Sequence, residues 1–273
     1  MSNPQGQTTF NYDPNGNMMS KLGPNGKDEF KYNGFNQLIE SAMSDGNWMR
    51  YSYDALGLRS SIAENGVLTN FTFDGDQVMS ETTASGNRVA NYVRGYGLLS
   101  QVDPQGRLYD MLSNGHGDVT GLLNCKGELV NSYTYDAFGQ TTEKKELIQN
   151  RFLYSGEQYD EITDTYYLRA RNYDPNLGRF TQEDTFRGDG LNLYSYVKNN
   201  PVNFVDPSGN ICVEVGGGGT STWDGKKLNS ITTTSKELEQ HYLKVLYSVS
   251  SSNSNNYWKA RECLGNNKNS WWR

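Results

Sequence analysis

An aromatic pattern that repeats about every 20 residues restricts the fold of this chain more than any other feature. Two aromatic residues separated by one position recur five times, at steps of 20, 21, 20 and 62 residues. The pairs are Phe10/Tyr12, Phe30/Tyr32, Tyr51/Tyr53, Phe71/Phe73 and Tyr133/Tyr135. Because 62 residues are close to three repeats, two weaker units are expected near Arg94 and Asn114. A period of this size is typical of stacked supersecondary units that bury a continuous core together.

A second series of residues has the same period. Dipeptides that favour turns end at Gly26, Gly46, Gly66, Gly86, Gly106 and Gly127. Asn-Gly and Asp-Gly tolerate positive φ, so two-residue hairpin turns are expected at Asn25-Gly26, Asp45-Gly46 and Asn65-Gly66. Side chains two positions apart on a strand share a face, so each aromatic pair should stack on the pair of the next unit. The sequence therefore predicts an all-β fold of stacked antiparallel hairpins.

The composition agrees with strands and turns. The 273 residues include 19 Tyr, 10 Phe, 5 Trp and 29 Gly against 7 Pro, and the formal net charge is −6. No apolar run approaches the roughly 20 residues of a transmembrane helix, so no membrane-spanning segment is expected. Three cysteines and two histidines lie far apart in the sequence, which predicts neither a metal site nor a cofactor.

Three turn segments resemble the YD repeats of Rhs and related polymorphic-toxin proteins: Tyr12-Asp-Pro-Asn-Gly, Tyr53-Asp-Ala-Leu-Gly and Tyr135-Asp-Ala-Phe-Gly. The sequence from Tyr166 to Asp184, and then from Asn192 to Gly209, resembles the Rhs-repeat-associated core domain. The resemblance implies a β-hairpin array over 1–145 that forms part of a shell, and an irregular core-domain plug over 146–210. It also implies a variable C-terminal toxin segment over 211–273.

The same resemblance implies self-cleavage. Asp184 and Asp206 match the two aspartates of the family's aspartic-type autoprotease, and the scissile bond would follow Asn210. Two close carboxylates share one proton, so one can activate water while the other protonates the carbonyl oxygen. The alternative is a turn role, since Asp before Pro or Gly commonly accepts backbone N–H bonds.

Two departures from the family pattern bear on cleavage. Thr185 follows the first aspartate where members commonly have Pro, and Asn210 stands where they commonly have Leu. If the family's Leu seats the scissile bond, Asn210 should seat it less well. Asn210 could also break the chain before Ile211 by attacking its own carbonyl with its side-chain amide.

Three arginines lie on or beside the Tyr-rich segment of the predicted core domain. For Arg169, Arg171 and Arg179 we expect mainly cation–π packing on Tyr167 and Tyr173, while Arg179 is the candidate for orienting a carboxylate.

The composition changes after Asn210. Residues 211–273 carry a net charge of +3 against −9 for the preceding part, and a glycine run occupies 216–219. A capping box and apolar residues at helical spacing predict a helix over 235–249. Within it, His241 is a candidate general base for metal-independent RNA cleavage, against the alternative of a solvated helix face.

Three functions fit these patterns. The first is a toxin scaffold that encloses and presents a C-terminal effector, with an immunity protein and an upstream shell or secretion apparatus as partners. The second is an RNase-like effector in 211–273, through which alone nucleic acid would bind. The third is a carbohydrate-binding module in which Tyr51 and Tyr53 stack on sugars. No secretory signal is visible at the N-terminus, so a secreted or cell-surface location would depend on an upstream region or a dedicated system.

Overall fold

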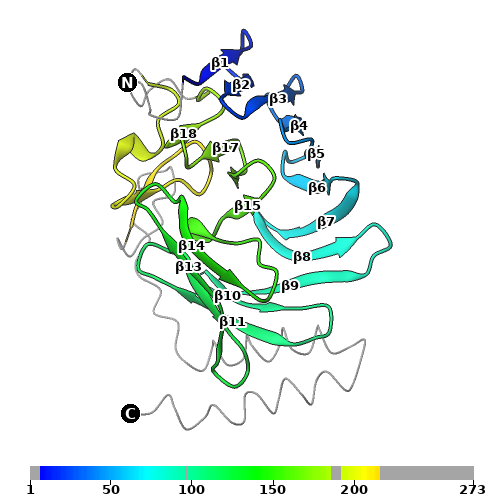
Figure 1. Cartoon of the computed structure of the whole chain (residues 1–273). Helices are drawn as coiled ribbons and strands as arrows, with labels where there is room; N and C mark the ends of the chain where they lie inside the picture. Colours follow the sequence, from blue (N-terminus) through cyan, green and yellow to red (C-terminus); the bar gives the residue numbers. More distant parts are fainter. Residues whose placement is uncertain (1–6, 96, 186–191, 216–273) are drawn as a thin grey trace.

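The computed structural model describes residues 7–95, 97–185 and 192–215. The predicted helix over 235–249 and His241 lie outside these residues. The described part is almost entirely β structure, which confirms the all-β prediction. Fourteen strands form one antiparallel sheet in strict sequence order, β1 to β14, and this sheet curls around a smaller sheet of four strands (Figure 1).

The fourteen strands make seven consecutive hairpins, as the period predicts. Their bounds are β1 (Thr9–Tyr12), β2 (Met18–Gly23), β3 (Gly26–Tyr32), β4 (Leu38–Ala42), β5 (Trp48–Tyr53), β6 (Arg59–Glu64), β7 (Val67–Asp74), β8 (Gln77–Thr83), β9 (Arg88–Arg94), β10 (Leu98–Val102), β11 (Leu108–Ser113), β12 (Val119–Leu123), β13 (Leu129–Tyr135) and β14 (Thr141–Glu146). The two weaker units expected near Arg94 and Asn114 are the hairpins β9–β10 and β11–β12.

An Asp or Asn side chain after the second aromatic position holds the turn within five of the seven hairpins that the structure describes. In the β5–β6 turn, the carboxylate of Asp54 accepts the backbone N–H groups of Leu56 and Leu58, both at 2.9 Å. Gly57 closes the turn with φ +83°, which costs a glycine little. The same pair of side-chain bonds recurs within hairpins at Asp13, Asn33, Asn114 and Asp136, and in the turns that join one hairpin to the next at Asp103 and Asn124.

The turns at the opposite ends of the hairpins differ from one another. Asn65-Gly66 is the predicted two-residue turn, with φ of 50° and 92° between the paired residues Glu64 and Val67. The Asn25-Gly26 prediction is displaced by one residue, because Gly23 pairs with Gly26 and the loop is Pro24-Asn25. A type I′ turn needs positive φ at its first loop residue. Pro24 occupies that position and cannot adopt positive φ, so this loop is not a type I′ turn. The turn at Asp45-Gly46 is longer, since the Met43 N–H donates to the Asn47 carbonyl.

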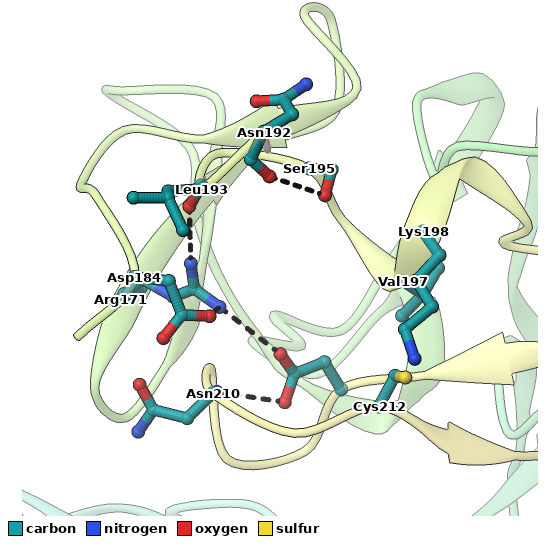
Figure 2. Close-up of a pocket in the computed structure, with 10 residues that line it drawn as sticks. Arg171, Asp184, Asn192, Leu193, Ser195, Val197, Lys198, Asn210 and Cys212 are labelled. Carbon is teal, nitrogen blue, oxygen red and sulfur yellow. Dashed lines mark hydrogen bonds and ion pairs between the residues drawn. The ribbon is translucent and has the colours of Figure 1, made fainter. Parts of the chain in front are cut away.

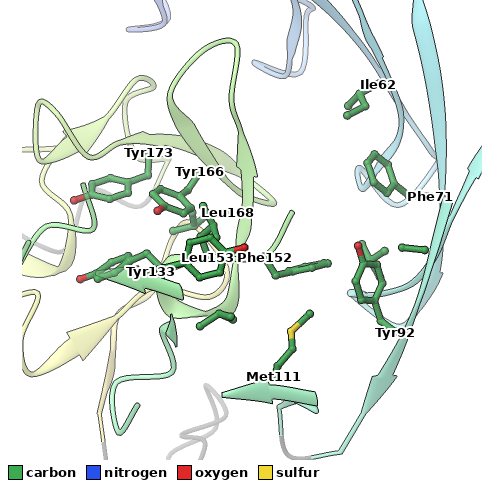
Figure 3. Close-up of a cluster of buried hydrophobic side chains, with 14 of the residues drawn as sticks. Ile62, Phe71, Tyr92, Met111, Tyr133, Phe152, Leu153, Tyr166, Leu168 and Tyr173 are labelled. Atoms are coloured by element: carbon green, nitrogen blue, oxygen red, sulfur yellow. The ribbon is translucent and has the colours of Figure 1, made fainter. Parts of the chain in front are cut away.

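The predicted stacking of aromatic pairs between neighbouring units is wrong. Each unit contributes two strands, so equivalent rings lie about 10 Å apart, beyond the 4.5–7 Å of ring contacts. Among the described residues, some ring contacts instead join the sheet to the segment it encloses, as between Tyr92 and Phe152 at 4.7 Å and between Tyr135 and Tyr154 at 6.0 Å. The others lie within the enclosed segment, as between Tyr166 and Tyr173. Figure 3 shows this shared core.

The enclosed segment carries the second sheet, of order β15-β16-β17-β18. Its strands are β15 (Gln158–Asp160), β16 (Thr165–Leu168), β17 (Arg171–Asp174) and β18 (Arg179–Phe180). Every residue of β16 and β17 is buried. A third, two-stranded sheet pairs β19 (Phe204–Val205) with β20 (Val213–Glu214), so the first residues after position 210 pair with the core segment.

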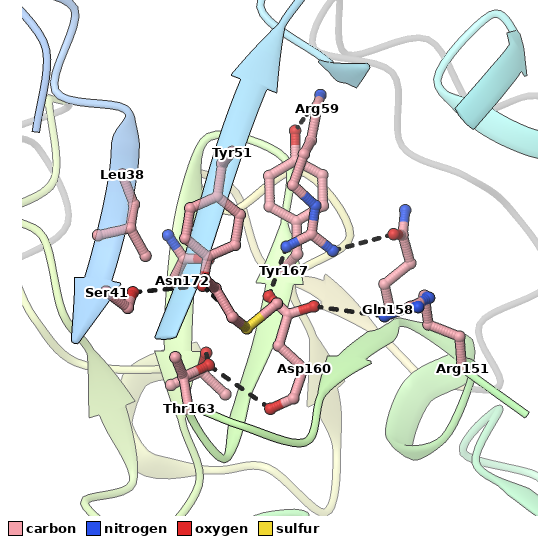
Figure 4. Close-up of polar contacts among 12 residues, drawn as sticks. Leu38, Ser41, Tyr51, Arg59, Arg151, Gln158, Asp160, Thr163, Tyr167 and Asn172 are labelled. Atoms are coloured by element: carbon pink, nitrogen blue, oxygen red, sulfur yellow. Dashed lines mark hydrogen bonds and ion pairs between the residues drawn. The ribbon is translucent and has the colours of Figure 1, made fainter. Parts of the chain in front are cut away.

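Buried charges tie the large sheet to the enclosed segment. Arg59 of β6 is fully buried, forms an ion pair with Asp160 and lies 4.2 Å from the ring centre of Tyr167 (Figure 4). Arg151 makes a second link through Glu64 at 3.0 Å and Glu81 at 3.3 Å.

Candidate functional site

The two predicted aspartates meet at one arginine. Arg171, the first residue of β17, places Nη2 2.8 Å from Oδ2 of Asp184 and 3.6 Å from Oδ2 of Asp206. Because both Oδ2 atoms lie close to the same nitrogen, they are at most about 6.4 Å apart. All three side chains are buried. The fold therefore brings together two residues that are 22 positions apart in the sequence.

Asp206 lies directly against the bond expected to be cut. Its Oδ1 accepts the N–H groups of Asn210 at 3.1 Å and Ile211 at 3.0 Å, and the hydroxyl of Ser208 at 3.1 Å. The nitrogen of Ile211 is the leaving group if the Asn210–Ile211 bond breaks. These contacts also make Asp206 a turn residue, so the structural role and the proximity to the bond occur together.

Burial raises the pKa of Asp206, although Arg171 and the backbone N–H groups oppose that rise. Burial also lowers the pKa of Arg171, against the attraction of Asp184 and Asp206. A carboxyl group with a raised pKa retains its proton closer to neutral pH, which is the property a general acid needs.

A small cavity adjoins these groups. It has a volume of about 20 Å³ and is lined by Arg171, Asp184, Asp206, Asn210, Lys198 and Cys212, among others (Figure 2). By this measure a water molecule needs about 10–15 Å³, so the cavity has room for one water. The space beside the candidate scissile bond thus matches the size of the nucleophile in a hydrolysis.

Arg171 is the residue of this candidate site that the sequence patterns missed. The expected cation–π packing on Tyr167 or Tyr173 is wrong for this side chain, which lies over Phe180 at 3.6 Å and points its nitrogens at the carboxylates. Tyr167 is instead covered by Arg59. Arg179, the expected carboxylate partner, lies on β18 and is exposed.

The tyrosines of the predicted carbohydrate surface lie on the inner side of the sheet. Tyr51 is 5% exposed, and the hydroxyl of Tyr53 donates to the carbonyl oxygen of Leu38 beneath the enclosed segment. The Tyr51 ring is therefore buried and the Tyr53 ring is half-buried, which does not favour stacking of this pair on a sugar. No group of three or more His, Cys, Asp or Glu side chains suited to a metal ion occurs within 7–95, 97–185 and 192–215.

The Teneurin YD-shell family model matches residues 4–202. The chain belongs to the YD-shell family. Since curated relatives of this YD-shell chain include Rhs-type toxins, the expected Rhs/YD-repeat family is confirmed. Within the part of the chain that the structure describes, no helix is long and apolar enough to cross a membrane.

Among the curated relatives is the tRNA nuclease WapA of Bacillus subtilis (strain 168), 36% identical over 230 residues, which cover 80% of the YD-shell chain and 10% of WapA. Another is the double-stranded DNA deaminase toxin A of Burkholderia cenocepacia (strain H111), 27% identical over 242 residues, covering 73% and 17%. The chain thus spans about a tenth of the length of the WapA relatives that it matches.

Solved structures show the same fold. The crystal structure of TcdB2-TccC3 has a TM-score of 0.54 and 18% identity, covering 74% of the YD-shell chain and 13% of that chain. The Photorhabdus luminescens Tc holotoxin pore has the same TM-score and identity, with coverages of 82% and 14%.

Proposed function

We propose that this chain is a scaffold segment of a longer YD-shell toxin, that it presents an effector carried by residues 211–273, and that it frees this effector by cutting the Asn210–Ile211 bond. The observation that carries the proposal is the position of Asp206. Its Oδ1 is 3.0 Å from the nitrogen of Ile211, while Arg171 joins it to Asp184. The division into 1–145, 146–210 and 211–273 belongs to this proposal.

The chemistry is a hydrolysis with two carboxyl groups in different protonation states. Asp184 has the closer contact to the Arg171 guanidinium, at 2.8 Å, and as a carboxylate it takes a proton from water as the water oxygen bonds to the Asn210 carbonyl carbon. Once the water oxygen has added to the carbonyl carbon, the nitrogen of Ile211 gains a free lone pair. Asp206, whose pKa is raised by burial, then gives a proton to this nitrogen as the carbon–nitrogen bond breaks. The products are a carboxyl group on Asn210 and an amino group on Ile211.

Two substitutions test this assignment. Asp184→Asn and Asp206→Asn each remove one acid–base group with little change in size. We expect intact-mass spectrometry to find the fragment 211–273 in the parent chain and to find it reduced at least 100-fold in both variants, since general acid–base groups contribute about 10²–10⁴-fold. Unchanged cleavage in both variants would remove the aspartates from the mechanism.

Asn210→Ala tests the competing route. If the side-chain amide of Asn210 attacks its own carbonyl, the N-terminal fragment ends in a ring that is lighter than the hydrolysis product by one water, and Asn210→Ala abolishes the cut. The aspartate mechanism expects a free carboxylate at Asn210 and continued cleavage in Asn210→Ala.

A nuclease effector in 211–273 is the second candidate, favoured by the names of the WapA relatives. We propose His241 as its general base, an immunity protein as the partner that blocks it, and an upstream shell or secretion apparatus as the route by which it acts outside the producing cell. The segment 211–273 produced alone should degrade tRNA, and His241→Ala should not. Intact tRNA with both would exclude this candidate and leave the scaffold proposal standing.

A further inference from the structure

The turn between β16 and β17 faces the backbone of the loop that leads to the candidate scissile bond. Three consecutive residues of the turn donate to three consecutive carbonyl oxygens of the loop, in the same order: Arg169 Nη1 to Pro207 at 2.5 Å, Ala170 N–H to Ser208 at 3.2 Å, and Arg171 Nε to Gly209. The next loop residue is Asn210. A matched series of this kind fixes both the position and the register of a peptide.

The fit around Gly209 gives an independent sign of the same close contact. Gly209 has φ +73°, and a Cβ at this position would collide with the carbonyl oxygen of Leu168 and lie 2.9 Å from the nitrogen of Arg171. Both of these atoms belong to the backbone, which cannot rotate away as a side chain can. The loop therefore lies so close to the turn that only glycine fits.

We propose that residues 168–171 form a clamp that positions the Asn210–Ile211 bond for cleavage, with Arg169 and Arg171 as positioning residues. This inference rests on the proposed self-cleavage. A loop held at three carbonyls keeps the reacting carbonyl beside the carboxyl pair without further ordering, and misplacement by about 1 Å can cost a reaction about 10²-fold. The clamp also offers a means of seating the bond without the leucine that family members have at position 210.

Arg169 is the better residue on which to test the clamp. Arg171 touches both candidate catalytic aspartates, so its replacement would disturb the acid–base groups as well. Arg169 is held by Glu157, 2.6 Å from its Nη1, and Asp76 lies 3.7 Å from its Nε. Its contact with the loop is the carbonyl oxygen of Pro207.

The first experiment follows cleavage over time after cell-free synthesis of the full chain. Arg169→Met keeps the aliphatic stem and removes the guanidinium, and we expect the rate of appearance of the 211–273 fragment to fall roughly 10- to 100-fold. Arg169→Lys retains a charged donor, so its cleavage rate should lie between those of Arg169→Met and the parent chain. Adding a small guanidinium compound to Arg169→Met should also restore part of the rate. A rate for Arg169→Met equal to that of the parent chain would overturn the clamp.

The second experiment compares two glycines of similar backbone conformation. Gly209→Ala forces the loop away from the turn, whereas Gly86 has φ +81° and no atom within 4 Å of the place that a Cβ would occupy, so Gly86→Ala imposes the backbone strain alone. We expect cleavage to be lost in Gly209→Ala and kept in Gly86→Ala. Equal cleavage in the two variants would contradict the clamp.

Hydrogen exchange separates the clamp from the cleavage proposal. In chains carrying Asp184→Asn, the amides of Asn210 and Ile211 should exchange at least tenfold faster when Arg169→Met is added. If the parent chain is never cut, the proposed function fails, yet faster exchange still supports the clamp. Equal exchange with and without Arg169→Met would reject the clamp whether or not cleavage occurs.

Discussion

A buried ion pair joins the large sheet to the enclosed segment. Arg59 and Asp160 are both completely buried, and Gln158 accepts a further bond from Arg59 at 3.0 Å. Taking two charges out of water is costly, and the pair is tolerated because each partner compensates the other. Removing one partner leaves an uncompensated charge, so replacing one residue should destabilise the fold more than replacing both.

Asp160→Leu should lower the free energy of unfolding by about 3–5 kcal/mol, because Arg59 is then buried without a counter-charge. The double variant Asp160→Leu/Arg59→Met should lose less than the single variant, since no charge remains in the site. Urea denaturation followed by circular dichroism measures both. A double variant that is less stable than Asp160→Leu would contradict this coupling between Arg59 and Asp160.

Glu157 should make stability depend on pH. Burial raises its pKa to about 7, although the neighbouring Arg169 opposes the rise, whereas an unfolded glutamate titrates near 4.3. Between these values the folded chain binds more protons than the unfolded chain, so this contribution to stability is complete below about pH 4.3 and is lost as the pH rises through about 7. Glu157→Gln should flatten this part of the profile of melting temperature against pH.

His116 has a raised pKa for a different reason. Burial opposes its charged form, but the hydrogen bond to Asp118 at 2.7 Å and the charge of that carboxylate outweigh burial. The stability it contributes is therefore present below about pH 6.5 and lost as the pH rises through the higher folded value. His116→Asn, which cannot become charged, should remove this loss in a pH series of melting temperatures.

At the scale of the element, the same hydrogen-bonded turn recurs along the large sheet. One acceptor oxygen at the first position receives two backbone N–H groups, and either Asp or Asn supplies it in different units. The aspartate that makes the Tyr-Asp pattern recognisable is therefore there for its oxygen rather than for its charge.

Asp54→Ala should lower the free energy of unfolding by about 1–2 kcal/mol, because two backbone N–H groups lose their acceptor. Asp54→Asn keeps an oxygen in place, as Asn33 and Asn114 do, and should stay within about 0.5 kcal/mol of the parent chain. Chemical denaturation measures both changes. Equal losses in the two variants would show that the charge matters.

The hairpins could be predicted from the sequence because their signals are local. Ring spacing and turn residues report on neighbours within about 20 positions, and the seven units follow from them. What the rings pack against could not be predicted, since the enclosed segment follows the repeats in the chain and reaches them only in the folded state. The local pattern therefore predicts ring contacts with the neighbouring unit, where the two-strand spacing forbids them.

Part of the candidate site could also be predicted from the sequence, and part could not. Asp184 and Asp206 carry a recognisable family pattern, and the expected scissile bond after position 210 follows from that pattern, so these positions could be predicted together. Arg171 could not, because an arginine among tyrosines has the same local pattern whether it packs on a ring or holds two distant carboxylates. Only the course of β16 and β17 beneath the loop decides between these roles.

At the scale of the whole molecule, the enclosed segment covers apolar side chains on the inner face of the large sheet. Tyr51, Phe71, Tyr92 and Tyr133 are each at most 7% exposed, and the enclosed segment shares their cluster. A sheet without that segment would present a wide apolar surface to water.

A chain that ends at Glu146 should therefore bind a hydrophobic dye strongly and associate at micromolar concentration. A chain that ends at Val215 retains the enclosed segment and should do neither. Dye fluorescence and sedimentation velocity compare the two. Monomeric, dye-free behaviour of the shorter chain would show that the sheet folds independently.

The order of the strands bears on how such genes change in length. Because each hairpin closes its own turn, a unit duplicated or deleted ahead of β1 leaves every later pairing intact. From β1 to Arg151 the situation differs, because bonds between the sheet and the enclosed segment would fall out of alignment. These bonds join Met18 to Thr181, Lys21 to Asp174, Arg59 to Asp160, and Glu64 and Glu81 to Arg151. Recombination should therefore vary the number of units ahead of this stretch and preserve the number within it.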